Sequence, residues 1–328
     1  MSQSLPFVTP DPVTCQPLGD GTLLIDTGFV RPGFDGAYLL VEGGRAAFVD
    51  CGTAHSVPRL LATLAAQGLQ PTDVEALILT HIHLDHAGGA GQLLQHLPHA
   101  QLLVHPRGAR HMADPSKLWA GASAVYGEEV MRRDYGELLP IPAERIIEAG
   151  EGHRFSLAGR ELHFLDTPGH ARHHLSIHDI SREQCFTGDT FGLSYREFDT
   201  PAGVFILPTT TPVQFDPRAL HASIDRIMAL QPRRLLLTHY GPVTAQPELT
   251  AQLHRLIDAM VTLAQDQAQL GGEERHMRLV QGLACLYRHA LDQHGWHGDE
   301  VEFMRLLGND IELNAQGLGI WLDQSPTH

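Results

Sequence analysis

Thr80-His-Ile-His-Leu-Asp-His86 places four metal-binding side chains within six residues: His81, His83, Asp85 and His86. The apolar run at 76–79 comes directly before them and predicts a buried strand, since short aliphatic runs suit a strand covered on both faces. Residues two apart on an extended segment point the same way, so His81 and His83 are expected to project together. The chain must then turn for the other two. Imidazole and carboxylate bind zinc, manganese or ferrous iron, so this stretch predicts a metal site.

Later predicted strands also end in side chains that bind metals. Runs at 161–165, 184–187 and 234–237 read as strands, and an earlier run reads as a strand at 46–49. Open sheets generally assemble their sites from the loops at strand ends. The residues that follow these strands therefore extend the candidate site: Asp50, His170, Asp189 and His239.

The chain also shows segments of different character. Residues 1–20 contain four prolines and predict an irregular arm, and further strands are expected at 22–25, 37–41, 101–104 and 175–178. Residues 106–150 predict a mostly helical insertion, explained either by amphipathic packing or by a lid over the site. From about 245 apolar residues recur at helical spacing, and Gly271-Gly272 predicts a break between two helices. The expected organisation is an arm at 1–20, a sheet domain at 21–245 and a helical region at 246–328.

Composition narrows the classes of partner. Hydrophobic residues make up 43% of the 328 residues, charged residues 19%, and the formal net charge is −15. A negative field disfavours nucleic acid and anionic membranes, so a small-molecule substrate is expected. The four cysteines form no CxxC pair and are interpreted as small buried apolar residues. With no secretory signal and no apolar run of membrane-spanning length, the sequence predicts a soluble cytoplasmic protein.

Four motifs in this order resemble those of the metallo-β-lactamase superfamily, over roughly residues 20–245. They are the His81 to His86 stretch, Thr167-Pro-Gly-His170, Gly188-Asp189 and Thr238-His239. The resemblance implies an α/β (α+β) fold, a four-layer αββα sandwich of two mixed β-sheets flanked by helices. The region after 245 would be a helical C-terminal extension, with a homodimer through its helices as a further expectation.

The resemblance also implies a division of the ligands between two divalent ions, Zn²⁺ with Fe or Mn as alternatives. His81, His83 and His170 would hold the first ion, and Asp85, His86 and His239 would hold the second. Asp189 would bridge the two ions, so Asp85 and Asp189 would flank a metal-bridging hydroxide that attacks a carbonyl carbon. Asp50 matches an aspartate that supports a ligand histidine. His105 is interpreted as a non-ligand.

The branch of the superfamily is less determined. The motifs resemble those of glyoxalase II-type thioesterases and of acyl-homoserine lactonases. The lactonase pattern has a tyrosine three residues after the bridging aspartate, where this chain has Gly192, and Tyr195 is a candidate substitute. The basic glutathione-binding pattern of glyoxalase II is not recognisable. Asp189 at the bridging position and the missing signal argue against a β-lactamase, and the acidic charge argues against a nuclease.

The leading hypothesis is a dinuclear metallohydrolase of a small ester, lactone or thioester. One alternative is a regulatory protein that keeps the metal site to sense a ligand or partner. A second is an iron-dependent oxidoreductase on the same ligands. The sequence leaves open the substrate, the native metal, the oligomeric state, and the roles of 106–150 and Tyr195.

Overall fold

The computed structural model describes residues 15–210 and 214–324. The described chain forms two compact units, one of residues up to 166 with 177–186, the other of 167–176 with residues from 187 onward. The expected arm at 1–20 is wrong for its last residues, because Cys15–Gly19 is a strand, and residues 1–14 lie outside the described part.

A seven-stranded mixed sheet forms the centre of the first unit. From β1 to β4 each strand pairs antiparallel with the next, and from β4 to β7 each strand pairs parallel with the next. Two of the parallel strands, β4 and β5, lead into Asp50 and the His81 stretch, and their buried aliphatic runs are the expected ones. In chain order and sheet order the strands are β1 Cys15–Gly19, β2 Thr22–Asp26, β3 Gly36–Glu42, β4 Arg45–Val49, β5 Val74–Ile78, β6 Gln101–Val104 and β7 Ile146–Glu148.

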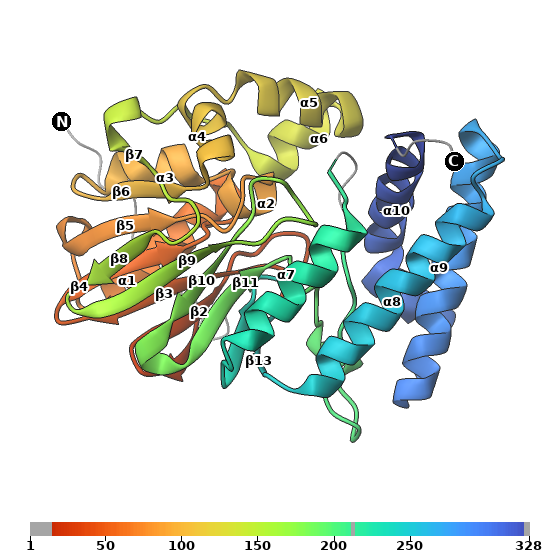
Figure 1. Ribbon diagram of the computed structural model, residues 1–328. Helices are drawn as coiled ribbons and strands as arrows, with labels where there is room; N and C mark the ends of the chain where they lie inside the picture. Colours follow the sequence, from red (N-terminus) through yellow and green to blue (C-terminus); the bar gives the residue numbers. More distant parts are fainter. Residues whose placement is uncertain (1–14, 211–213, 325–328) are drawn as a thin grey trace. The chain divides into compact units, whose positions relative to one another are not determined.

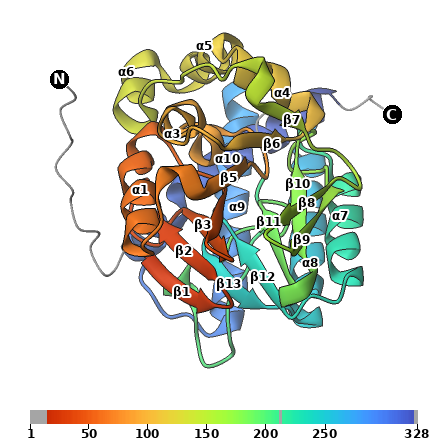
Figure 2. The ribbon, with the colours of Figure 1, turned by 90° about the vertical axis from the view of Figure 1, so that its left-hand side faces the viewer.

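Two helices pack on this sheet and form its core. They are α1 (Val57–Ala66) and α3 (Ala90–His96), which contribute Leu60, Leu64 and Leu93 to a cluster with buried residues of the strands. Figure 2 shows both helices along the same side of β2, β3 and β5. Burial of these aliphatic side chains stabilises the strand that leads into the His81 stretch.

Residues 106–150 are not purely a helical insertion. They form α4 (Pro106–Ala113), α5 (Ser116–Tyr126), α6 (Glu128–Val130) and a π-helix at Met131–Tyr135. The last part of the segment then returns to the sheet as β7, parallel to β6. The segment therefore completes the sheet as well as covering it, which the sequence did not predict.

The second sheet has six strands in the order β13-β12-β11-β10-β9-β8. The pairs β8 with β9, β10 with β11 and β12 with β13 are antiparallel. The strands β9, β10, β11 and β12 were expected, whereas β8 and β13 were not. Their bounds are β8 Arg154–Leu157, β9 Arg160–Asp166, β10 Leu175–Asp179, β11 Gln184–Gly188, β12 Arg234–Leu237 and β13 Gly241–Thr244.

Helices dominate the rest of the second unit (Figure 1). After α7 (Pro217–Ala229), the chain forms α8 (Pro247–Asp266), α9 (Gly272–His294) and α10 (Glu300–Gln324). The break predicted at Gly271-Gly272 is confirmed, because α8 ends at Asp266 and α9 begins at Gly272. None of the helices in the described residues has the length and apolarity that crossing a membrane requires.

Candidate metal centre

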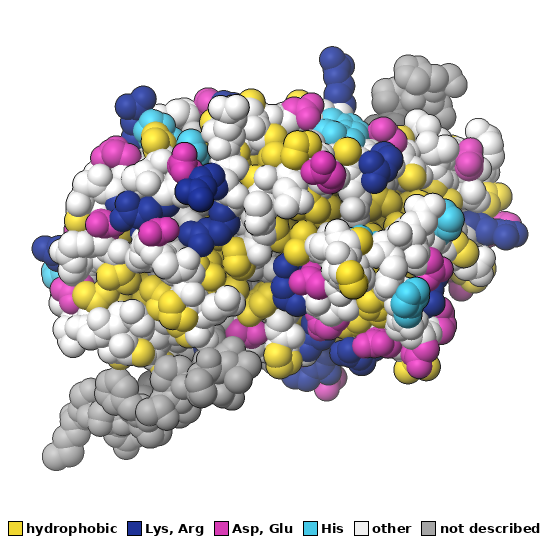
Figure 3. Space-filling view, turned by 90° about the horizontal axis from the view of Figure 1, so that it is seen from below, with side chains coloured by type: hydrophobic (Ala, Val, Ile, Leu, Met, Phe, Trp, Pro, Cys, Tyr) yellow, Lys and Arg dark blue, Asp and Glu magenta, His cyan; other side chains and the backbone are white. Residues whose placement is uncertain are grey.

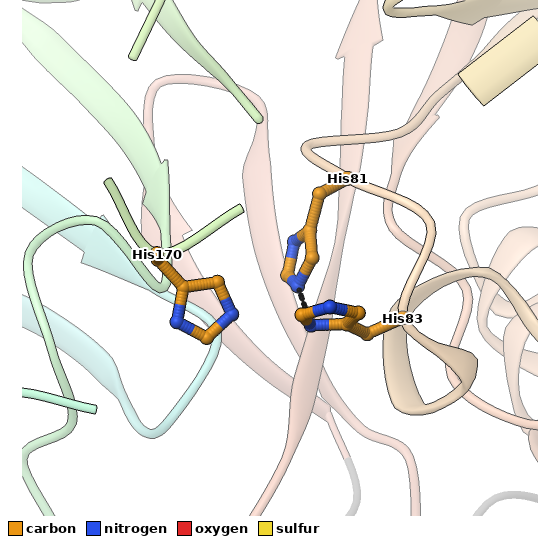
Figure 4. A group of neighbouring side chains, drawn as sticks. All are labelled: His81, His83 and His170. Carbon is orange, nitrogen blue, oxygen red and sulfur yellow. Dashed lines mark hydrogen bonds between the residues drawn. The ribbon is translucent and has the colours of Figure 1, made fainter. Parts of the chain in front are cut away.

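The loop after β5 carries the first ligand group, which we define as His81, His83, Asp85 and His86. The strand ends at Ile78, so His81 and His83 lie in the loop that follows it. The two rings nevertheless meet, with His81 Nε2 2.7 Å from His83 Nδ1. Figure 4 draws this contact as a dashed line, together with the ring of His170.

The other two members of the first ligand group lie on a single helical turn, α2 (Leu84–Ala87). The expected turn of the chain is therefore helical, and it presents Asp85 and His86 from adjacent positions. The Cys51 amide donates to the His86 carbonyl oxygen at 2.9 Å, which ties this turn to the end of β4. Its geometry is thus set by a contact between residues far apart in the sequence.

Asp50, at the end of β4, orients the first ligand group. Its carboxylate accepts hydrogen bonds from the Thr80 amide and hydroxyl, both at 2.8 Å, and lies 3.0 Å from His86 Nδ1. A carboxylate only accepts, so His86 Nδ1 carries the proton and Nε2 keeps the lone pair that a metal needs. Asp50 has a left-handed backbone, φ 56°, which few residues other than glycine adopt.

Asp50→Asn is expected to weaken metal binding by about 10–100-fold, because the amide no longer fixes the His86 tautomer with a negative charge. Competition with a chromophoric chelator measures the affinity. Asp73→Asn is the matched control, since Asp73 is a partly exposed carboxylate in the same unit that accepts a hydrogen bond from the Gln70 amide. Equal chelator competition by Asp50→Asn and the parent protein would contradict the orienting role.

The second ligand group is His170, Asp189 and His239, and it lies in the second unit. His170 Nε2 is 3.4 Å from Asp189 Oδ2, and His239 Nε2 is 3.7 Å from Asp189 Oδ1. His170 Nδ1 lies 3.3 Å from the Thr209 carbonyl oxygen, which fixes the proton on Nδ1 and frees Nε2 to bind a metal. Two histidines from different loops thus direct nitrogen atoms towards one carboxylate.

His174 is a residue of this group's surroundings that the sequence did not single out. The Asp189 amide donates to His174 Nε2 at 3.1 Å, so Nε2 accepts and the neutral ring carries its proton on Nδ1. His174 Nδ1 then donates to the Thr167 or Thr190 hydroxyl, at 3.0 and 3.1 Å. The buried ring therefore holds the Asp189 loop. The sequence feature that could have pointed to His174 is the presence of three histidines within residues 170–174.

The donor chemistry of both groups fits divalent metal ions. All members offer imidazole nitrogen or carboxylate oxygen, most are buried, and the second-group nitrogen–oxygen distances exceed those of strong hydrogen bonds. Among the described residues, the groups of three or more side chains that could hold a metal are made up of His81, His83, Asp85, His86, His170, Asp189 and His239. How they divide between ions stays a prediction.

Two other candidates have different surroundings. Tyr195 is fully buried, and its hydroxyl lies 3.2 Å from both carboxylate oxygens of Asp310 on α10. His105 Nδ1 accepts from the Arg107 amide, and its Nε2 lies 3.3 Å from Asp166 Oδ1. Both side chains thus have protein partners outside the two ligand groups.

The cysteines are not all buried. Cys51 and Cys185 are buried, and burial raises the pKa of both thiols. Cys15 is half-buried, however, and Cys285 is exposed, so the interpretation of all four as core residues is wrong for these two.

Comparison with known proteins decides the family. The family model of the metallo-beta-lactamase superfamily matches residues 30–239, more than half of the chain. The chain belongs to the metallo-beta-lactamase superfamily. The match contains both ligand groups, and two mixed sheets with flanking helices are the sandwich that the sequence predicted for this superfamily.

Relatives within the superfamily match only part of the chain. A metallo-beta-lactamase fold-containing protein of Sulfurisphaera tokodaii is 31% identical over 52% of this chain and 62% of its own length. A hydroxyacylglutathione hydrolase of Stenotrophomonas maltophilia is 32% identical over 46% of this chain and 44% of its own length. The chain thus spans less than two thirds of each relative.

The fold likeness extends further than the sequence likeness. The crystal structure of an archaeal metallo-beta-lactamase superfamily protein from Sulfolobus tokodaii matches with a TM-score of 0.63 at 24% identity. It covers 91% of this chain, and the match covers 98% of that structure. The superfamily fold is therefore shown well beyond the segment of recognisable sequence similarity.

Proposed function

We propose that this protein is a dinuclear metal-dependent hydrolase of a small ester, lactone or thioester. The observation that carries the proposal is the presence of two histidine and aspartate groups, each with one histidine ring oriented by a hydrogen-bond acceptor of its own unit: His86 by Asp50, and His170 by the Thr209 carbonyl. Such orientation is typical of metal-binding histidines. The substrate is a small molecule in this proposal, and dimerisation and the cytoplasmic location stay predictions.

In the proposed site the two ligand groups share one pair of ions, most simply zinc. His81, His83 and His170 would hold one ion, Asp85, His86 and His239 would hold the other, and Asp189 would be shared by the two. Two divalent ions against two ligand carboxylates leave a net positive site, which suits a substrate carbonyl that gains negative charge during the reaction.

Two such ions, when bound, would activate a water molecule and polarise the substrate carbonyl. The residues of the chain provide the fixed geometry that this chemistry needs. Asp50 keeps the proton on Nδ1 of His86, and the Thr209 carbonyl does the same for His170. His174 holds the backbone amide of Asp189, so that the bridging carboxylate keeps one orientation.

The hollow beside α2 is too small to hold a substrate. Leu84 on α2, together with Met112, Leu118, Leu138 and Leu139 of the 106–150 segment, lines it, and it has room for about one water molecule. On the face drawn in Figure 3, basic side chains are interspersed with acidic ones. The name of the hydroxyacylglutathione hydrolase relative favours a thioester.

The test is a hydrolysis screen over aryl esters, lactones and acyl thioesters, with zinc, iron and manganese quantified in the same sample. The proposal expects about two ions per chain and turnover of at least one class that chelation removes and metal restores. Two bound ions without turnover of any class would favour the regulatory alternative. Oxygen-dependent turnover with bound iron would favour the oxidoreductase.

Tyr195→Phe is expected to leave kcat/KM within about threefold and to lower stability by about 1 kcal/mol, since the hydroxyl bonds Asp310 inside the helical region. Kinetics and urea denaturation of the same sample measure both quantities. Tyr287→Phe is the matched control, because Tyr287 is also fully buried and bonds Asn314 in that region. A fall in kcat/KM of about 100-fold or more with unchanged stability would instead assign Tyr195 to catalysis.

A further inference from the structure

A cluster of two histidines and two aspartates joins α7 to α8 in the second unit. Each helix repeats one pattern, a histidine followed four residues later by an aspartate: His221 and Asp225 on α7, His254 and Asp258 on α8. Residues four apart lie on the same face of a helix. None of the four belongs to either ligand group, so this histidine–aspartate cluster is separate from the candidate metal centre.

The ion pairs within the cluster cross between the helices. His221 Nε2 lies 3.0 Å from Asp258 Oδ1, and His254 Nε2 lies 2.8 Å from Asp225 Oδ1. The two rings are inclined by 26° to each other, with centroids 4.7 Å apart. Their Nδ1 atoms are in direct contact with each other. In each ring, therefore, Nε2 lies beside a carboxylate and Nδ1 contacts Nδ1 of the other histidine.

The proton positions follow from this arrangement. A carboxylate only accepts hydrogen bonds, so Nε2 of both histidines carries a proton. In the neutral rings both Nδ1 atoms then hold lone pairs that face one another. Two lone pairs in contact repel, so an electrophile belongs between them, either a single shared proton or a metal ion.

We propose that His221 and His254 bind one divalent transition-metal ion, such as Zn²⁺, Ni²⁺ or Cu²⁺, through their Nδ1 atoms. A carboxylate on the far nitrogen of a ligand histidine is the usual companion of such a bond, because it fixes the tautomer and raises the basicity of the ligand. Imidazole suits these three ions. Here each helix supplies the carboxylate that contacts the histidine of the other helix, so both histidines are oriented in the same way.

The exposure of the cluster suits an ion that keeps water ligands. The His221 and His254 side chains are 27% and 25% exposed, which leaves an open side for solvent. Bonds of about 2.0–2.1 Å to a tetrahedral ion require the two nitrogens to move apart to about 3.3 Å, and half-buried rings on a helix surface can rotate that far. The bound ion would link α7 to α8 and offset the charge of Asp225 and Asp258.

Zinc titration by calorimetry, with metal counted after dialysis, tests the site. The parent protein is expected to bind about one more zinc ion per chain than the His221→Gln/His254→Gln variant. Asp225→Asn/Asp258→Asn should weaken this additional site by about 10–100-fold without removing it. His289→Gln, an exposed histidine on α9, is the control and should bind as many ions as the parent.

The thermal midpoint provides a second measurement that is independent of activity. Zinc should raise the midpoint of the parent protein more than that of the double-glutamine variant, because the ion joins two helices only in the folded state. Equal zinc stoichiometry in the parent and the variant would overturn the proposal. That result would assign a shared proton to the two Nδ1 atoms.

Discussion

Asp189→Ala is expected to lower kcat/KM of the metal-dependent hydrolysis by about 1,000-fold or more. The variant loses the only carboxylate of the second ligand group, and with it the proposed bridge between two ions. Loss of about 4 kcal/mol of transition-state stabilisation corresponds to three orders of magnitude in rate. Metal content measured on the same sample should fall by about one ion per chain.

The control for this variant is Asp292→Ala. Asp292 is an exposed carboxylate on α9 whose partner is the Arg288 guanidinium at 3.1 Å, so its removal should change neither metal content nor rate. An Asp189→Ala protein that kept two ions and the parent rate would disprove the bridging role. An Asp189→Ala protein that lost one ion without losing rate would disprove the need for a dinuclear centre.

Arg160→Ala is expected to lower the free energy of unfolding by about 3–5 kcal/mol, because it leaves the charge of Asp179 buried without its cation. The side chains are 1% and 0% exposed, and Arg160 Nε lies 2.8 Å from Asp179 Oδ2. Arg160 Nη2 also donates to the Thr22 hydroxyl at 2.8 Å, so one guanidinium joins β9 to β2. Urea denaturation followed by circular dichroism measures the change.

Two further variants separate lost charge pairing from lost packing. Arg160→Met/Asp179→Leu removes both charges together and should be more stable than Arg160→Ala, since apolar residues of similar size can replace a buried pair. Arg132→Ala should change the urea midpoint little, because its partner Glu128 and Arg132 itself are mostly exposed. A double variant less stable than Arg160→Ala would contradict this explanation.

The strands missed from the sequence share one structural property, since each lies at the edge of a sheet. They are β1 and β7 in the first sheet and β8 and β13 in the second. An edge strand is short and partly exposed, so it needs no continuous aliphatic run, and β1 and β13 each contain a proline. The central strands were recognisable because burial on both faces requires apolar residues throughout.

For the candidate metal-binding stretch at 80–86, the sequence likewise predicted some features and tertiary structure decided the others. The order of the motifs indicated the superfamily, because ligand-type residues after successive strands form a pattern along the chain. The pattern could not show that His81 and His83 lie in a loop, or that α2 presents Asp85 and His86. A period of two residues holds only while the backbone is extended, and β5 ends at Ile78.

The sequence alone determined the class of the protein: a metallo-beta-lactamase fold with histidine and aspartate residues, the candidate metal ligands, at strand ends. Burial and ligand chemistry restrict residue types at fixed positions along the chain, and such restrictions are readable in one dimension. Tertiary structure decided which nitrogen of each histidine keeps its lone pair. Asp50 selects the nitrogen for His86, and the Thr209 carbonyl selects it for His170. Asp258 and Asp225 select it for His221 and His254. These partners are distant in sequence, and only folding brings an acceptor to one particular ring nitrogen.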